Sequence, residues 1–375
     1  MKITAVRFIQ GGSPIPDGGF WPAWWPRQPI YQIGYSICVI ETDEGITGFG
    51  PGRVRTGQHG WSSEPFVREL VLGADPTEVG ALIGRLEYLP QQRPPPLEIE
   101  HALWDVLGKA AGLPVYKLLG GCRGEVPAYC STGSTLSPQV HVDQAWDAYT
   151  RGYRAIKLRL HRPALADDLA VVRAVRDALP DDMAIMADAN QTQNFYWSRA
   201  TALRCARALE EMGVLWLEEP LPPFDDEGLR ELRHKVEIPI AGGENQYRLH
   251  AFRESIARGR WDILQPDVSG CGGLLEWTRI ASLAHAHLLP CIPHVWNNGL
   301  GLACSLHAIG AVPNAPWAEV TDDLQWPADL RDRLLTRPHQ VREGIIQVPQ
   351  GPGWGVELNW EYVEANASLD TRIEL

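Results

Sequence analysis

The segment MAIMADANQ (residues 183–191) decides the fold of this chain, together with VLWLEEP (214–220) and IPIAGGEN (238–245). Each is a short apolar run typical of a buried strand, and each reaches a carboxylate at or near its end. The three carboxylates are Asp188, Glu218 and Glu244. They are 30 and 26 residues apart (218 − 188 and 244 − 218), about the length of one strand–helix unit. A parallel barrel brings the ends of consecutive strands together, so we expect these side chains to converge.

The chemistry of these three side chains indicates a metal site. Carboxylate oxygens are hard ligands, and three of them with room left for substrate and water suit Mg²⁺ better than a soft or tetrahedral metal. Glu219 follows Glu218 directly, and strand alternation points its side chain elsewhere. A single acid of this kind is more often solvated, so the ordered trio carries the prediction. We expect it to hold Mg²⁺ beside an anionic substrate.

Composition excludes several classes of protein. Of 375 residues, 45% are hydrophobic and 21% charged, as in ordinary globular proteins. The net charge of −12 argues against a nucleic-acid partner, which would require a basic patch. No stretch reaches the ~18 apolar residues of a membrane span, and the opening MKITAVRFIQGG lacks a signal-peptide core. The seven cysteines are scattered without CxxC pairs, so we expect free thiols in the cytoplasm.

From Val126 onward, short apolar runs alternate with amphipathic stretches, which predicts parallel strands joined by helices. The expected strands are Val126–Ser131, Ala155–Leu158, Ala184–Ala187, Val214–Leu217, Ile238–Ala241, Ile263–Gln265, Cys291–Pro293 and Trp317–Val320. These units, within residues 126–320, fit a (β/α) barrel with a site at the C-terminal ends of its strands. Asp267 follows the sixth expected strand and His294 the seventh, so the carboxylate should orient the imidazole.

Residues 1–125 have a different pattern. The runs Tyr31–Thr42 and Gly45–Gly50 predict a β-hairpin, and helical patterns extend from about Pro65 to Gly112. The segment GGSPIPDGGFWPAWWPRQP (11–29) is dense in Gly, Pro and Trp. It is either a plain surface loop or a lid, and we favour the lid because exposed Trp side chains are costly unless they pack on something. We expect the C-terminal tail to fold back onto this region.

The segment EHALWDVLGKAAGLPVYKLLGG (100–121), joined to the three carboxylates and a later histidine, resembles the enolase superfamily and its mandelate racemase-like branch. The resemblance covers essentially the whole chain. It implies a modified TIM (β/α) barrel, residues 126–320, with an α+β N-terminal capping domain, residues 1–125, completed by the tail 321–375. Members of that family bind Mg²⁺, hold a substrate carboxylate on it and abstract the proton α to that carboxylate.

The resemblance also implies individual roles. His294 matches the base of the racemase-like branch, and Asp267 matches its partner. Lys157 would help to bind the substrate carboxylate and stabilise the enediolate. Asn190 could hydrogen-bond a substrate hydroxyl or carboxylate, and Glu319 matches an acid that bonds the substrate carboxylate when protonated. The small-molecule substrate is therefore expected to be a carboxylate.

One position departs from the family pattern. The segment AIKLRLHR (155–162) places Arg159 where the pattern most often has a second lysine that acts as a base. Arginine stays protonated and is a poor base, but it anchors carboxylates well. A racemase needs a base on each face of the reacting carbon, whereas a dehydratase can work with one. The departure favours dehydration of an acid sugar, an aldonate or aldarate, to a 2-keto-3-deoxy acid.

Two alternatives remain open at this point. One is a racemase or epimerase of a hydroxy acid that uses Lys157 as its second base, and the other is a non-catalytic binding protein on the same scaffold. Arg53, Arg55 and His59 are expected, with the Trp-rich loop, to read the distal hydroxyls of the substrate. We expect a homo-oligomer, because closed symmetric assemblies are common, and no membrane partner.

Overall fold

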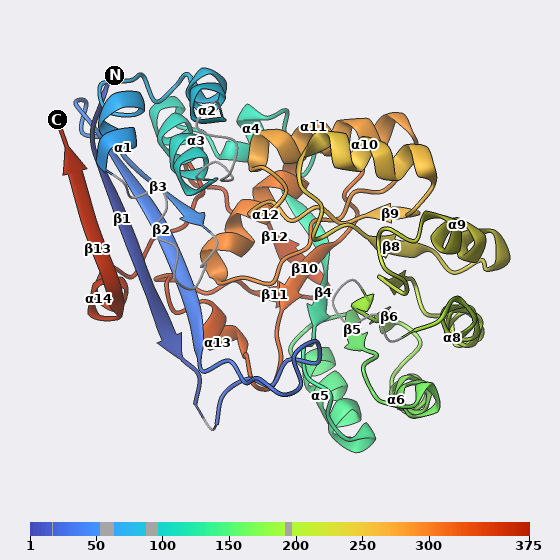
Figure 1. Ribbon diagram of the computed structural model, residues 1–375. Helices are drawn as coiled ribbons and strands as arrows, with labels where there is room; N and C mark the ends of the chain where they lie inside the picture. The colour runs from blue at the N-terminus through green and yellow to red at the C-terminus, as the bar shows by residue number, and fades with distance from the viewer. Residues whose placement is uncertain (17, 53–63, 88–96, 192–196) are drawn as a thin grey trace.

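The computed structural model describes residues 1–16, 18–52, 64–87, 97–191 and 197–375. A four-stranded antiparallel sheet lies beside a larger, mainly parallel sheet that carries helices on its outside (Figure 1). Within the described residues, no helix has both the length and the apolar character needed to cross a membrane.

The antiparallel sheet contains strands from both ends of the chain. In sheet order its strands are β13 (Ala367–Glu374), β1 (Ile3–Pro14), β2 (Gln32–Thr42) and β3 (Thr47–Gly52). The predicted hairpin is confirmed, because β2 and β3 pair antiparallel around a turn at Gly45, whose φ is +76°. The helices of this domain are α1 (Glu64–Leu70), α2 (Val79–Glu87), α3 (Leu97–Ala111) and the short α4 (Val115–Leu118).

Helix α3 packs directly on β3, and glycine permits the close approach. A Cβ atom on Gly50 would lie 2.3 Å from the backbone nitrogen of Ala102, a separation that no side chain could occupy. The inner face of α3 is buried, from Leu97 to Gly108. Helix α3, which carries Trp104 and Asp105, is thereby held against the antiparallel sheet.

The barrel is built from parallel strands joined by helices, as the alternation predicts. Its strands are β4 (Glu125–Ser131), β5 (Ala155–Arg159), β6 (Ala184–Asp188), β7 (Leu217–Glu218), β8 (Ile240–Gly242), β9 (Ile263–Leu264) and β10 (Ala318–Thr321). They pair in chain order, and β10 pairs with β4. Its helices are α5 (Pro138–Thr150), α6 (Leu165–Ala178), α8 (Arg199–Glu211), α9 (Asp226–Lys235), α10 (Arg248–Arg258), α11 (Leu274–Ala286) and α12 (Gly299–Ala311).

The barrel interior beneath the strand ends is filled by side chains, as in other barrels of this type. The buried residues of this inner cluster are Tyr129, Ala155, Met186, Trp216, Ala241, Ile263 and Ile292. Helix α12 is buried along its whole length and contacts both α4 and β3, so it joins the barrel to the capping domain.

The expected strand Cys291–Pro293 is not a named strand. Only Cys291 forms an isolated parallel bridge, to Leu264, and the Ile292 N–H donates to the Leu264 carbonyl at 2.9 Å. Two prolines, Pro290 and Pro293, flank this segment and cannot donate to a ladder, which explains why pairing stops there. The expected strand at Val214–Leu217 is likewise shorter and displaced, to Leu217–Glu218.

The tail 321–375 does more than complete the capping domain. After the short α13 (Ala328–Arg331), strands β11 (Val341–Arg342) and β12 (Ile345–Gln347) form a hairpin whose β12 pairs antiparallel with β4 of the barrel. Helix α14 (Trp360–Ala365) then leads into β13, which pairs with β1. The tail therefore contributes strands to both sheets. The domain boundaries at residues 125 and 320 remain a prediction.

Candidate active site

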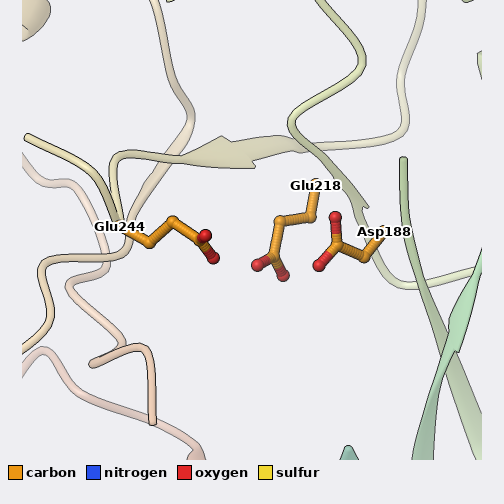
Figure 2. A group of neighbouring side chains, drawn as sticks. All are labelled: Asp188, Glu218 and Glu244. Atoms are coloured by element: carbon orange, nitrogen blue, oxygen red, sulfur yellow. The ribbon is translucent and has the colours of Figure 1, made fainter. Parts of the chain in front are cut away.

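The three carboxylates converge at the ends of adjacent strands. Asp188 closes β6, Glu218 closes β7 and Glu244 follows β8 by two residues. Each offers an oxygen atom, and these atoms all lie within 4.8 Å of one another. Figure 2 shows the three side chains directed toward a common point. The expected convergence is therefore present, and all three groups are buried.

Backbone turns after the strands set this arrangement. Asn190 and Glu219 have φ values of +43° and +44°, an uncommon conformation for residues other than glycine. The Asn190 N–H donates to Oδ1 of Asp188 at 2.8 Å, and the Glu219 carbonyl accepts from the Gln191 N–H at 2.9 Å. Glu218 joins the trio and Glu219 does not, as strand alternation predicts. Strained residues of this kind gather at functional sites, where the surrounding structure holds them in place.

The charge balance of the trio suits a divalent cation. Burial and the neighbouring Glu218 raise the pKa of Asp188 to about 7, although Arg159 and Lys157 oppose the rise. Oε2 of Glu244 is buried and accepts no hydrogen bond of regular geometry from the described residues, although Nε2 of His294 lies 3.3 Å from it. The three buried carboxylates supply hard oxygen donors, and a cation of the Mg²⁺ class coordinates such ligands.

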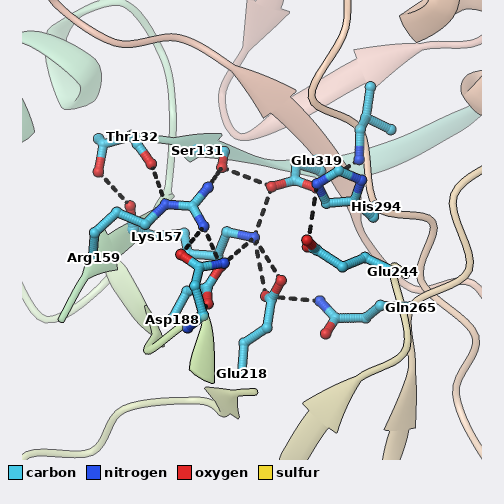
Figure 3. Close-up of polar contacts among 12 residues, drawn as sticks. Ser131, Thr132, Lys157, Arg159, Asp188, Glu218, Glu244, Gln265, His294 and Glu319 are labelled. Carbon is cyan, nitrogen blue, oxygen red and sulfur yellow. Dashed lines mark hydrogen bonds and ion pairs between the residues drawn. The ribbon is translucent and has the colours of Figure 1, made fainter. Parts of the chain in front are cut away.

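Lys157 lies beneath the trio and is completely buried. Its Nζ lies 3.0 and 3.1 Å from the two carboxylate oxygens of Glu218 and 2.7 Å from Oε1 of Glu319. Burial lowers the pKa of Lys157, but Glu218 and Glu319 outweigh that effect and raise it well above its ordinary value. Lys157 is thus an ammonium group inside the carboxylate cluster (Figure 3).

Arg159, two residues further along β5, lies on the same side of the strand. Its Nη1 contacts Asp188 and donates to Oδ1 of Asn190 at 3.1 Å, and its Nε donates to the Thr132 carbonyl at 2.7 Å. Both Lys157 and Arg159 therefore face the barrel mouth, as their spacing predicts. Asn190 also reaches Asp188 directly, since its Nδ2 donates to that carboxylate at 3.1 Å.

His294 and Asp267 meet as expected from their adjacent strand ends. Nδ1 of His294 lies 2.9 Å from Oδ2 of Asp267, whose Oδ1 accepts from the Ser269 N–H and hydroxyl. Nδ1 therefore carries the proton, and Nε2 faces Glu244 at 3.3 Å. Burial lowers the pKa of His294, but Glu244 and Asp267 outweigh it and raise the pKa to about 10. At this pKa both ring nitrogens are protonated, and the largest raising cause is Glu244. A cation bound by Glu244 would therefore lower the pKa and free Nε2 to act as a base.

Glu319 is surrounded by hydrogen-bond donors. It accepts from the Ser131 hydroxyl, from the Val295 N–H and from Lys157, each at 2.7 Å. Burial raises its pKa, but Lys157 and His294 outweigh burial and hold the pKa at about 2. These three contacts favour the carboxylate form in this arrangement, and the role expected for Glu319 when protonated beside a substrate carboxylate stays a prediction.

Sequence reasoning missed two residues of the site. Nε2 of Gln265 donates to Oε2 of Glu218 at 2.8 Å, and Nε2 of His161 lies 2.9 Å from Oδ1 of Asn190. Both occupy positions that a stricter use of strand alternation could have found: Gln265 directly follows β9, and His161 follows Arg159 by two residues. The predicted hydroxyl-reading residues Arg53, Arg55 and His59 lie outside the described residues.

Comparisons with known proteins agree with this geometry. Residues 26–120 match the model of the mandelate racemase / muconate lactonizing enzyme N-terminal domain, and residues 141–363 match the enolase C-terminal domain-like model. The L-talarate/galactarate dehydratase of Salmonella typhimurium is 30% identical, over 95% of this chain and 87% of its own. The D-galactarolactone cycloisomerase of Agrobacterium fabrum is 31% identical, over 96% of this chain and 97% of its own.

A solved structure extends the similarity to three dimensions. The L-talarate dehydratase from Polaromonas sp. JS666, complexed with Mg and L-glucarate, superposes with a TM-score of 0.84 and 30% identity, over 100% of this chain and 99% of that one. The family models together span most of the described fold, and the site lies within the larger of them. The chain belongs to the mandelate racemase / muconate lactonizing enzyme family of the enolase superfamily.

Proposed function

We propose that this chain is a Mg²⁺-dependent dehydratase of an acid sugar, an aldonate or aldarate, and that its product is a 2-keto-3-deoxy acid. The observation that carries the proposal is one imidazole, His294 oriented by Asp267, set against a centre of three carboxylates. Opposite it, β5 presents Arg159, which is no base. The Salmonella relative, which is named as a dehydratase of talarate and galactarate, supports the same class of reaction.

The binding centre divides into a metal site and fixed positive charges. Asp188, Glu218 and Glu244 would hold Mg²⁺, which when bound stabilises the negative charge that develops on a substrate carboxylate. Lys157 and Arg159 add two cations that are already in place before the substrate arrives. Such preorganised charge in a buried site is worth more than the same charge in water.

His294 performs the two proton transfers. Its Nε2 takes the C2 proton, and the electrons of the C–H bond move toward the carboxylate to form an enediolate. Asp267 stabilises the imidazolium that results. The imidazolium then returns the proton to the C3 hydroxyl, the C3–O bond breaks and water leaves. The enol that remains tautomerises to the 2-keto acid, so the net change is loss of one water molecule.

The two alternatives rank below dehydration. An epimerase would need Lys157 as a neutral amine, yet its ammonium lies within 3.1 Å of both Glu218 and Glu319. A non-catalytic binding protein has no need of the complete trio together with an oriented imidazole. All seven cysteines are free, which supports a reducing compartment such as the cytoplasm. The homo-oligomer remains a prediction.

Proton NMR in D₂O tests the function directly. The purified protein with Mg²⁺ is incubated with a panel of aldonates and aldarates. We expect one or more of them to lose the C2 proton signal and to gain a C3 methylene signal, which identifies the substrate at the same time. Deuterium entering C2 without a methylene would contradict dehydration and favour the epimerase.

A further inference from the structure

The Trp-rich loop lies within the segment 11–29, and its residues 18–29 are docked on the barrel. The Ala23 N–H donates to the Gly133 carbonyl at 2.8 Å, and Pro22 forms an isolated antiparallel bridge with Ser134. The Trp21 N–H donates to Oε1 of Gln325 at 2.8 Å. In Figure 1 the loop after β1 extends from the end of the antiparallel sheet toward the start of α5. The expected lid is therefore held by backbone contacts to the segment after β4.

Docking places an aromatic cluster at the barrel mouth. Its members are Phe20, Trp24, Trp296 and Trp326. The ring centroids of Trp24 and Trp296 are 5.0 Å apart and their planes are nearly perpendicular, at 85°. Gly133 makes room for the cluster, since a Cβ atom there would lie 2.4 Å from the Trp296 ring. The loop of the capping domain and the segment after His294 thus form one aromatic corner.

The guanidinium of Arg159 occupies this corner. Its central carbon lies 5.2 Å from the ring centroid of Trp24 and 5.3 Å from that of Trp296. Arg159 is 2% exposed, so both cation–π contacts are desolvated, where they are strongest. A guanidinium packed against two indoles and hydrogen-bonded to the backbone cannot swing as a lysine ammonium could.

Not every N–H group of the Arg159 guanidinium has an acceptor among the described residues. Nε donates to Thr132, and Nη1 contacts both Asp188 and Asn190. Nη2 has one long contact, 3.4 Å to the Ser131 hydroxyl. Arginine carries five N–H groups, so one N–H of Nη2 has no acceptor among the described residues. A buried donor without an acceptor is costly, and a substrate oxygen would satisfy it.

We propose that Trp24 and Trp296 are positioning residues that fix the Arg159 guanidinium as a donor to an oxygen of the bound acid sugar. This inference rests on the proposed function. The capping domain then contributes to catalysis through Trp24, because the loop must be docked before Arg159 is correctly oriented. The side of the site opposite His294 thereby carries a fixed cation.

The test combines kinetics with a spectroscopic signal. Trp24→Leu removes the ring, Trp24→Phe keeps a smaller one, and Trp146→Leu is the control for an exposed tryptophan away from the loop, since Trp146 lies on α5 and is 40% exposed. We expect Trp24→Leu to lower kcat about tenfold, Trp24→Phe to lower it less and Trp146→Leu to leave it within about twofold. In an Arg159→Lys background, Trp24→Leu should have little further effect, because the group it positions is gone.

The Nε–H resonance of Arg159 reports on the contact without any turnover. It is assigned by its loss in Arg159→Lys, and ring currents from the two indoles should displace it. We expect Trp24→Leu to move this resonance and Trp146→Leu to leave it in place. An unmoved resonance in Trp24→Leu, or equal kinetic losses in Trp24→Leu and Trp146→Leu, would overturn the inference. If the resonance moves but no acid sugar reacts, the proposed function fails and the positioning contact stands.

Discussion

One buried carboxylate, Asp105, and the buried trio of Asp188, Glu218 and Glu244 have different roles in this protein. Asp105 on α3 accepts from the Phe49 N–H at 2.9 Å, from the Trp354 N–H at 2.8 Å and from Lys109 at 2.7 Å. The trio of Asp188, Glu218 and Glu244 instead holds three acids close together, with more negative charge than Lys157 and Arg159 offset. The first arrangement is complete in itself and ties β3, α3 and the tail together. The second keeps capacity for a ligand.

The comparison separates structural from functional acids by what their oxygen atoms contact. An acid whose oxygen atoms already accept hydrogen bonds from the surrounding fold should matter for stability and little for turnover. An acid held beside others of its own charge should matter for turnover, and its removal should relieve repulsion.

The largest effect is expected at the base. His294→Asn should lower dehydration by about 10⁴-fold, at the upper end of what general acid–base catalysis contributes, because His294 is the imidazole that an aspartate orients beside the trio, whereas His161 contacts Asn190. Steady-state turnover measures this, with circular dichroism to confirm the fold. Dehydration at the full rate would refute the one-base mechanism. Continued exchange of the C2 proton without dehydration would instead identify Lys157 as a second base.

Removing one acid of the trio comes next. Glu244→Gln should lower turnover by about 10³-fold, since loss of one carboxylate ligand removes several kcal/mol of charge stabilisation. Its unfolding midpoint in urea should stay unchanged or rise, because a like charge is removed from a buried cluster. Calorimetric titration with Mg²⁺ should show weaker binding than in the parent protein. Unaltered Mg²⁺ affinity would exclude Glu244 from the ligand set.

Asp105→Asn should show the opposite profile. The amide cannot accept from all three donors and leaves Lys109 without its ion pair, so we expect about 3 kcal/mol of lost stability. Turnover per folded molecule should be unchanged. The matched control is Asp147→Asn, whose exposed pair with Arg151 should be worth less than about 1 kcal/mol. Equal losses of unfolding free energy in the two variants would break the comparison.

The smallest effect concerns pH at the cap–barrel contact. Nδ1 of His307 accepts from the Tyr116 N–H at 3.1 Å, Nε2 lies 2.9 Å from the Trp354 carbonyl, and burial lowers the pKa to about 4. The unfolded chain, with a pKa near 6.5, binds the proton first, so stability falls as pH drops from about 6.5 toward 4. Between pH 7.5 and 5.5 this histidine should contribute a loss of about 1 kcal/mol.

Urea unfolding at the two pH values, compared between the parent protein and His307→Gln, isolates that contribution. The variant should lose less stability on acidification than the parent does, because glutamine does not titrate. An identical pH dependence in both proteins would show that His307 is not held in the neutral form by the fold.

The sequence by itself determined the barrel, the order of its strands and the places of the main acids and bases. This was possible because strand–helix units repeat at a regular interval and strand ends lie together at one face. Positions at successive strand ends were enough to assign Asp188, Glu218 and Glu244 to one cluster. In the same way, Asp267 could be paired with His294. The departure at Arg159 was also visible, because it alters a short local pattern on β5.

Only the tertiary structure decided which groups complete the site. Trp24 reaches Arg159 across 135 positions (159 − 24), and Glu319 is held by Lys157, the Ser131 hydroxyl and the Val295 N–H, which come from separate segments. The division of the tail between the two sheets was also decided by tertiary contacts, since β12 pairs with β4 and β13 pairs with β1. Periodicity encodes which side of an element a residue faces, whereas contacts between distant segments depend on how whole elements pack.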